Sequence, residues 1–251
     1  MILIFFIFGL IFGSFANVLI YRIPLEKSII KPGSFCPLCG RAIYWYDNIP
    51  FLSFILLKGR CRFCGEKISI LYPLVELLMG ISFALSFYFF NFSLKTLIFI
   101  ILSFYTIVIS AIDLKHRIIP DEINFTLFLL GVFIPKGGIS YFKGVLFSVF
   151  SGICAGVVLF VLAVIFSRVF KTEALGMGDV KLITALAAFG GFSSIFWLIF
   201  ISSLLGSIVG IFIKIIKRQK GYTTIAFGPY LCLALIIFLI LKNKLTLFFI
   251  L

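Results

Sequence analysis

Two of the nine acidic residues in this 251-residue sequence stand where long apolar segments meet polar ones. Asp113 follows the apolar run that ends at Ile112, and Asp179 precedes the run that begins at Val180. Two carboxyl groups that share one site cannot both ionise cheaply, so one keeps a proton and acts as an acid while the other activates a water molecule. Asp113 and Asp179 are therefore the predicted catalytic pair of an aspartic hydrolase.

Residues close to the two aspartates are predicted to support the site. Gly176 and Gly178 have no Cβ atoms, so an extended substrate backbone can approach the second aspartate closely. Pro120 fixes a bend after the first aspartate. Asp121 then caps the following helix or supports the site, rather than joining the pair. Lys181, two residues after the second aspartate, completes this supporting set.

A plainer interpretation treats each aspartate as a boundary charge that a neighbouring cation neutralises. Lys115, Arg117 and Lys181 are close enough in sequence to do so. Taken singly, each aspartate fits this interpretation better than a catalytic role. Taken together, the two aspartates favour catalysis, because the spans predicted below place both at the same depth in the membrane and because Gly-x-Gly precedes Asp179. His116, the only histidine, has no second catalytic partner and is expected to be an interfacial loop residue.

A second cluster with chemical potential is formed by Cys36, Cys39, Cys61 and Cys64, arranged as two Cys-x-x-Cys-Gly repeats. Each repeat can place two thiolates on one tetrahedral Zn²⁺, and the glycine that follows relieves the tight turn. Four thiolates close the coordination sphere, so the predicted zinc is structural. The alternative is a pair of disulfides, which requires that this loop face the oxidising side of the membrane.

Glu76 lies inside an apolar run, where an acid is costly and usually faces the interior of a helical bundle. Packing, hydrogen bonding and participation in a site all remain open for it. Small residues also recur four apart, at Gly9/Gly13, Gly152/Gly156 and Gly206/Gly210. This spacing favours ordinary helix packing over a dimer face, although a homo-oligomer remains possible.

The elements that must position these residues are membrane-spanning helices. The sequence is 63% hydrophobic and 12% charged, and a soluble domain of this size could not bury so much apolar surface. The apolar N-terminus lacks a basic leader and a cleavage site, so residues 1–20 are expected to remain as a first span. We predict an all-α bundle of about eight spans: 2–20, 71–91, 94–112, 123–135, 142–168, 180–194, 195–215 and 226–248.

The distribution of basic residues predicts the orientation of this bundle. Of the 22 lysines and arginines, 17 fall in the segments 22–70, 113–122, 168–181 and 214–220. The positive-inside rule therefore places the N-terminus outside and both the cysteine loop and the aspartates at the cytoplasmic face. Cytosolic thiols stay reduced, which favours zinc over disulfides. The net charge of +13 is attributed to these loops and not to nucleic-acid binding.

At this point the ordered set of motifs resembles the bacterial type IV prepilin leader peptidases over most of the chain. The resemblance is carried by motifs in this order: Gly13-Ser14-Phe15-Ala16-Asn17-Val18, Tyr21-Arg22-Ile23-Pro24, the cysteine pairs with Asp47-Asn48-Ile49-Pro50 and Gly59-Arg60-Cys61, Tyr72-Pro73-Leu74-Val75-Glu76-Leu77, Asp113 to Asp121, Gly176-Met177-Gly178-Asp179-Val180-Lys181-Leu182, and Phe227-Gly228-Pro229. One departure is Leu71, where family members often carry arginine.

The resemblance implies a membrane-embedded aspartic endopeptidase of the bacterial inner membrane. It would remove basic leaders from prepilins and pseudopilins, with Asp113 and Asp179 as the matching catalytic aspartates. Many members then methylate the new N-terminus with S-adenosylmethionine, and the cysteine loop is associated with that step. The predicted organisation is a first transmembrane helix at 1–21, a cytoplasmic zinc loop at 22–70 and a transmembrane peptidase domain at 71–251.

Three other functions fit parts of the pattern. An intramembrane protease that shares the Gly-x-Gly-Asp motif would cut within substrate spans instead of at a leader junction. A transporter could use Asp113 and Asp179 as proton or cation sites. A non-enzymatic scaffold built around the zinc loop would keep its function without either aspartate.

Overall fold

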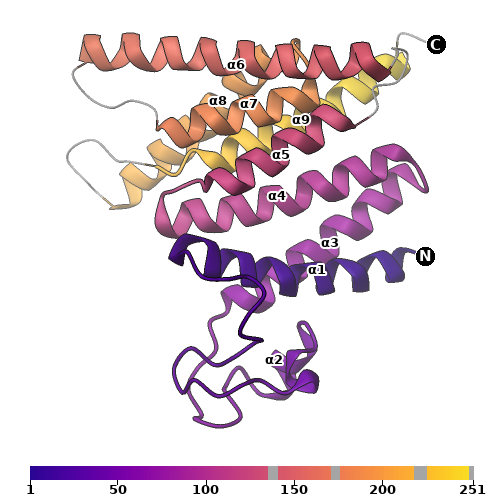
Figure 1. Ribbon diagram of the computed structural model, residues 1–251, viewed down its shortest axis with the longest axis vertical. Helices are drawn as coiled ribbons and strands as arrows, with labels where there is room; N and C mark the ends of the chain where they lie inside the picture. The colour runs from indigo at the N-terminus through magenta and orange to yellow at the C-terminus, as the bar shows by residue number, and fades with distance from the viewer. Residues whose placement is uncertain (135–140, 171–175, 218–224, 249–251) are drawn as a thin grey trace. The chain divides into compact units, whose positions relative to one another are not determined.

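The computed structural model describes residues 1–134, 141–170, 176–217 and 225–248 (Figure 1). Within these ranges every regular element is helical, and the extended pairing is confined to two isolated bridges, Phe35 with Ala42 and Arg60 with Lys67. The predicted all-α class is therefore confirmed. By internal contacts the chain divides into two compact units, Met1–Ala111 and Ile112–Leu251.

All eight predicted spans coincide with helices, which are α1 (Ile2–Arg22), α3 (Leu71–Phe90), α4 (Leu94–His116), α5 (Asp121–Phe133), α6 (Tyr141–Phe170), α7 (Met177–Gly190), α8 (Ser194–Lys217) and α9 (Gly228–Phe248). Among the described residues, five of them are long and apolar enough to cross a membrane, namely α1, α3, α4, α6 and α8. The protein is thus a multi-pass membrane protein, while the count of eight spans stays a prediction.

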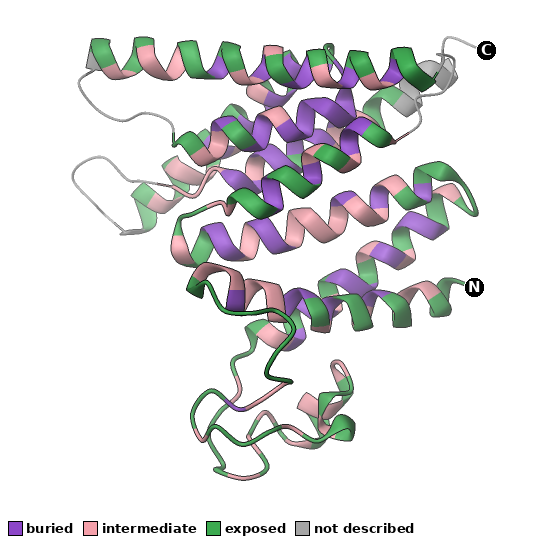
Figure 2. Cartoon of the chain, viewed as in Figure 1, coloured by how far each residue is buried: buried purple, intermediate pink, exposed green. Residues whose placement is uncertain are grey.

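The surfaces of the long helices are apolar, as lipid contact requires. Phe8 and Phe15 on α1 are exposed, as are Phe150 on α6 and Phe212 on α8. Figure 2 shows such exposed positions recurring along α6 and along α1. In water these side chains would be unfavourable, so hydrocarbon is the solvent that this surface fits.

In the first unit, α1 packs closely against α3. A Cβ atom on Gly13 would lie 2.5 Å from the Cα atom of Glu76, and one on Gly9 would lie 2.6 Å from the carbonyl oxygen of Met79. These two glycines therefore bring the two backbones together. This contact within the chain fits the packing interpretation of the spacing.

The same explanation holds for the glycine pairs of the second unit. A Cβ atom on Gly152 would lie 2.9 Å from the carbonyl oxygen of Thr184 on α7, and one on Gly156 would meet the hydroxyl of the same threonine. A Cβ atom on Gly210 would lie 2.5 Å from a methyl carbon of Ile225. These glycines also face neighbouring segments of their own chain.

The short helix α7 is the core of the second unit. It packs against α5, α6, α8 and α9 (Figure 1), and every residue from Ala185 to Gly190 is buried (Figure 2). The hydroxyl of Ser151 on α6 donates to the carbonyl oxygen of Ala187, 3.0 Å away. Gly191 follows the helix at φ 77°, a left-handed conformation that glycine adopts without strain.

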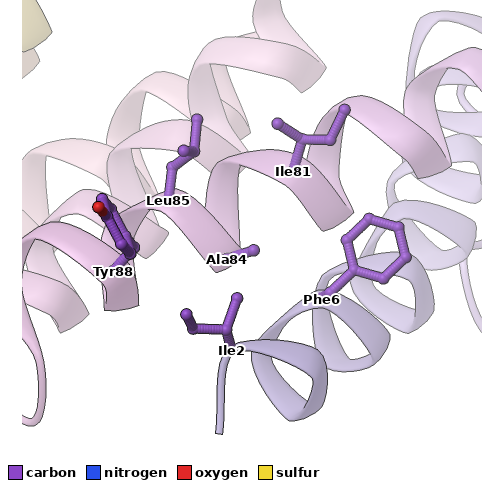
Figure 3. A pocket seen from close by; sticks show the side chains of 6 residues that line it. All are labelled: Ile2, Phe6, Ile81, Ala84, Leu85 and Tyr88. Atoms are coloured by element: carbon purple, nitrogen blue, oxygen red, sulfur yellow. The ribbon is translucent and has the colours of Figure 1, made fainter.

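A small apolar groove opens between α1 and α3 in the first unit (Figure 3). Its lining consists of Ile2, Phe6, Ile81, Ala84, Leu85 and Tyr88. It contains no acid, histidine or cysteine, so this groove offers no groups for hydrolysis. Its walls suit a hydrocarbon chain.

Candidate active site

Asp113 lies in the last turn of α4 and is buried, with 5% of its surface exposed. Its Oδ2 atom accepts a hydrogen bond of 2.9 Å from the backbone N–H of Gly228, the first residue of α9. Burial of a carboxyl group is unfavourable unless hydrogen bonds compensate it. The start of α9 supplies that compensation from a distant part of the sequence.

Asp179 is the third residue of α7, and this short helix is not among the five membrane-length helices. Burial and, to a smaller extent, the negative charge of Asp113 raise the pKa of Asp179 to about 6. The backbone at Gly176 acts in the opposite sense and lowers it. Because the charge of one aspartate acts on the other, the two predicted residues belong to one electrostatic environment.

The neighbouring cation does not neutralise Asp179. The ammonium nitrogen of Lys181 lies 2.8 and 2.7 Å from the two carboxylate oxygens of Asp121, and both side chains are exposed. A further ion pair joins Arg62 to Asp47 in the cysteine loop. The interpretation of Asp179 as a charge that Lys181 satisfies is therefore wrong.

The capping role predicted for Asp121 is also wrong. Helix α5 begins at Asp121 itself, Pro120 occupies the N-cap position, and no side chain caps this end. An N-cap side chain must precede the first turn to accept its free N–H groups, and Asp121 already lies in that turn. Pro120 does mark the bend between α4 and α5, as predicted.

The two glycines before Asp179 have intramolecular reasons to lack side chains. A Cβ atom on Gly178 would lie 3.3 Å from the Cβ atom of Ile119, so this glycine lets α7 begin close to the α4–α5 connection. A Cβ atom on Gly176 would lie 3.4 Å from Oδ2 of Asp179. A side chain at Gly176 would therefore crowd the carboxyl group of Asp179, and one at Gly178 would press on Ile119. Room for a substrate strand beside them remains a prediction.

The four cysteines of the loop come together. Their sulfur atoms all lie within 4.8 Å of one another, and the Sγ atoms of Cys36 and Cys64 are 4.0 Å apart. Tetrahedral coordination with Zn–S bonds of about 2.3 Å requires sulfur separations of roughly 3.8 Å. The observed cluster therefore fits a single tetrahedral metal ion. All four thiols are free of disulfides.

The two cysteine repeats adopt matching turns. In each turn, the backbone carbonyl oxygen of the first cysteine accepts a hydrogen bond from the N–H of the glycine four residues later. Gly40 donates to Cys36, and Gly65 donates to Cys61. The two glycines have φ values of 70° and 71°, which side chains rarely adopt. The N–H groups of Cys64 and Phe63 lower the pKa of the Cys61 thiol to about 7. This turn thus stabilises the thiolate form of Cys61, the form that binds metal.

Buried polar residues fasten the cysteine loop to α1 and α3. Arg22 donates to the carbonyl oxygens of Ser28, Pro32 and Gly33, at 2.9, 2.7 and 3.0 Å. Glu76 accepts a 2.7 Å hydrogen bond from the N–H of Phe51. Of the roles left open for Glu76, the structure shows hydrogen bonding, because its carboxyl group accepts from the backbone of the loop.

Sequence reasoning did not find every polar group near the core. Gly228 belongs to one of the motifs, but the sequence does not predict that its backbone N–H donates to Asp113. Every residue except proline has a backbone N–H, so the residue type does not indicate such a donor. Asn124 on α5 is 5% exposed, and both its amide atoms are buried without a hydrogen-bond partner among the described residues. Its position between apolar residues gave no reason to select it.

Together these features define a multi-pass helical membrane protein with one buried and one half-buried carboxyl group that interact, and with a four-thiol loop. Comparison with known families places the chain more narrowly. Residues 7–90 match the bacterial peptidase A24 N-terminal domain, and residues 100–211 match the type IV leader peptidase family. The chain belongs to this family, as its motifs predicted.

Three relatives illustrate the extent of the similarity, each named a prepilin leader peptidase/N-methyltransferase. The protein from Neisseria gonorrhoeae is 34% identical over 250 residues, covering 90% of this chain and 85% of its own. The one from Pseudomonas aeruginosa is 30% identical over 261 residues, covering 95% and 89%. The Myxococcus xanthus protein is 36% identical over 221 residues, covering 87% of this chain and 65% of its own length. No solved structure matches the chain.

Proposed function

We propose that this chain removes the leader peptides of type IV prepilins and pseudopilins, with Asp113 and Asp179 as its catalytic residues. The observation that carries the proposal is that Asp113, buried at the end of α4 and hydrogen-bonded by the N–H of Gly228, acts by its charge on the half-buried Asp179 of α7 and raises the pKa of Asp179. Such coupling is what a pair holding one proton requires.

The reaction needs one water molecule and no covalent enzyme intermediate. The ionised carboxylate takes a proton from water as its oxygen attacks the scissile carbonyl carbon. The protonated carboxyl group gives its proton to the carbonyl oxygen, which would otherwise carry a negative charge. When the C–N bond breaks, the first aspartate returns its proton to the leaving amine and the second recovers one from the new acid.

The proposed membrane arrangement puts this chemistry at the cytoplasmic face of the bacterial inner membrane, with the N-terminus outside. The clustering of lysine and arginine in a few segments supports this orientation. The apolar helix of the prepilin would then enter among the lipid-facing spans while its basic leader stays in the cytosol. Lipid and prepilin are the expected partners, nucleic acid is not, and a homo-oligomer is compatible with the contacts seen.

For the loop, we assign a structural Zn²⁺ to Cys36, Cys39, Cys61 and Cys64, since four thiols at these separations leave no position for a reacting water. Methylation of the new N-terminal amine by S-adenosylmethionine is the second proposed activity. Its support is the shared name of the relatives, peptidase and N-methyltransferase. The position of the S-adenosylmethionine site is left unassigned.

The test is cleavage of a prepilin by the full chain reconstituted in liposomes, read by intact mass. Asp113→Asn and Asp179→Asn should each abolish loss of the leader while the protein remains folded and inserted. Glu122→Gln is the matched control, because it removes an exposed carboxylate from the same unit. A further gain of one methyl group in the wild-type product would report the second activity.

Other outcomes separate the rival functions. Full processing by either aspartate variant would defeat the catalytic assignment and leave a scaffold. A cut in the middle of the substrate helix would favour an intramembrane protease. Ion flux without substrate, lost in both variants, would favour a transporter.

A further inference from the structure

The hydrogen bond between Gly228 and Asp113 distinguishes the two aspartates of the proposed site. It joins residues far apart in the chain, it is buried, and its length of 2.9 Å is that of a full hydrogen bond. A donor fixed by the backbone favours the ionised form of the carboxyl group that accepts it. Asp113 has this donor from α9.

The donor is available because of the way α9 begins. The first amides of a helix have no acceptor within the helix. Here Pro229 has no N–H, and the N–H groups of Tyr230 and Leu231 both donate to the carbonyl oxygen of Phe227, at 3.1 and 3.3 Å. The N–H of Gly228 is therefore the outward-facing donor of this first turn, and it points at Asp113. The positive end of the α9 dipole adds to its effect.

Burial disfavours the ionised form of both aspartates, and Asp179 differs from Asp113 in the charges around it. Burial and the charge of Asp113 outweigh the local backbone at Gly176, and the pKa of Asp179 is raised to about 6. Its nearest lysine is engaged by Asp121. At Asp113, the N–H of Gly228 and the positive charge of Arg117 both favour the ionised form against the cost of burial. The proton that the two aspartates share therefore resides preferentially on Asp179.

We infer that the backbone N–H of Gly228 is a positioning group that fixes Asp113 as the ionised base of the pair and leaves Asp179 as the proton-bearing acid. This inference rests on the proposed function. It assigns the two proton transfers: Asp113 takes the proton from the attacking water, and Asp179 gives its proton to the carbonyl oxygen. On C–N cleavage, Asp113 protonates the amine and Asp179 regains a proton from the new carboxyl group.

The experiment removes only this donor. Glycolic acid incorporated at position 228 replaces the amide N–H with an ester oxygen and keeps the backbone length. A matched ester at Tyr230, made with the hydroxy acid of tyrosine, removes an N–H that serves α9 alone. Gly228→Ala keeps the N–H and adds a methyl group. Each protein is reconstituted in liposomes and its cleavage rate is measured across pH.

The Gly228 ester should lower kcat about tenfold or more, the effect of one hydrogen bond to a charged group, with little change in KM. Because more alkaline solution is then needed to ionise the base, the acidic limb of the pH profile should move up by about one pH unit. The Tyr230 ester and Gly228→Ala should keep the wild-type limbs. A merely structural role of Gly228 would lower the rate without moving a limb.

Two results would overturn the inference. Movement of the alkaline limb alone would make Asp113 the acid, and unchanged limbs would show that Gly228 does not set the proton's position. Failure of the proposed function is a separate outcome, since it requires that Asp113→Asn still cleave prepilin. An inactive Asp113→Asn together with unchanged limbs in the Gly228 ester would reject only the assignment of base and acid.

Discussion

Asp179→Asn should make the folded protein more stable at neutral pH. In the folded chain, burial and then the charge of Asp113 raise the pKa of Asp179 from 3.8 to about 6. The folded state therefore binds the proton more tightly than the unfolded state does. The contribution of the protonated Asp179 side chain to the free energy of unfolding is therefore fully present below about pH 4. It is lost as the pH rises through about 6.

The size of the effect follows from the displacement of the pKa. It is roughly two pKa units, and each unit corresponds to roughly 1.4 kcal/mol. Above about pH 7 the ionised group thus destabilises the folded protein by about 3 kcal/mol. The amide of the variant does not ionise, so the variant escapes this penalty. Its advantage over the wild type should grow from near zero at about pH 4 to about 3 kcal/mol at about pH 8.

The assay is thermal unfolding of the detergent-solubilised protein, followed by tryptophan fluorescence at a series of pH values. For a chain of this size, 1 kcal/mol corresponds to about 2–4 °C, so the melting temperature of Asp179→Asn should exceed that of the wild type by roughly 6–12 °C at alkaline pH. Glu122→Gln removes an exposed charge that water solvates and should show no such pH-dependent gain. Asp113→Asn removes the second cause of the raised pKa of Asp179. In that variant, the pH range over which the stability linked to Asp179 is lost should be narrower.

The reasoning would be refuted if the melting curves of Asp179→Asn and the wild type ran parallel across the pH range. That result would mean that Asp179 is no harder to ionise in the folded chain than in the unfolded one. A carboxyl group in that state would not hold its proton between about pH 4 and pH 6, as the proton-bearing member of the pair is expected to do. The catalytic proposal would then lose its main physical support.

Three further outcomes are expected. Gly13→Ala should destabilise the protein by about 1–3 kcal/mol through overpacking of α1 on α3. Gly33→Ala is the control and should not destabilise it, because nothing lies within 4 Å of the added atom. Equal melting temperatures of the two variants would contradict the close packing of α1 on α3. Cys36→Ser should release bound zinc, measured by elemental analysis, and lower methylation more than cleavage, whereas Cys154→Ser should retain the metal; retained zinc in Cys36→Ser would reject the four-thiol site. Asn124→Val should stabilise the folded protein by about 1–3 kcal/mol, because it removes a buried side-chain amide that has no hydrogen-bond partner in the described part of the chain. A lower melting temperature would indicate that the amide is satisfied.

Several features were predictable because they depend on local patterns. Long apolar runs of about 20 residues specify helices in lipid wherever they pack, and all eight predicted segments are helical. Two Cys-x-x-Cys-Gly repeats specify two similar turns, and the structure brings their sulfur atoms within 4.8 Å. The ordered motifs predicted the family, which the comparisons confirm.

Other features depended on which helices meet, and no single segment carries that information. Hydropathy alone predicted one more span at 180–194, whereas the tertiary structure shows that α7 is short and that its residues from Ala185 to Gly190 are all buried among neighbouring helices. The cap assigned to Asp121 failed because the helix begins at that residue and because Lys181 on another helix engages its carboxylate.

The amino-acid sequence by itself determined the helical class, the membrane environment, the four-thiol cluster and the identity of the two candidate aspartates. Only the tertiary structure decided that the charge of Asp113 acts on Asp179 and that Gly228 at the start of α9 donates to one of them and not to the other. The physical reason is that desolvation and backbone hydrogen bonds are properties of packed neighbours. Residue type and spacing identify a carboxyl group, but its surroundings decide where its proton resides.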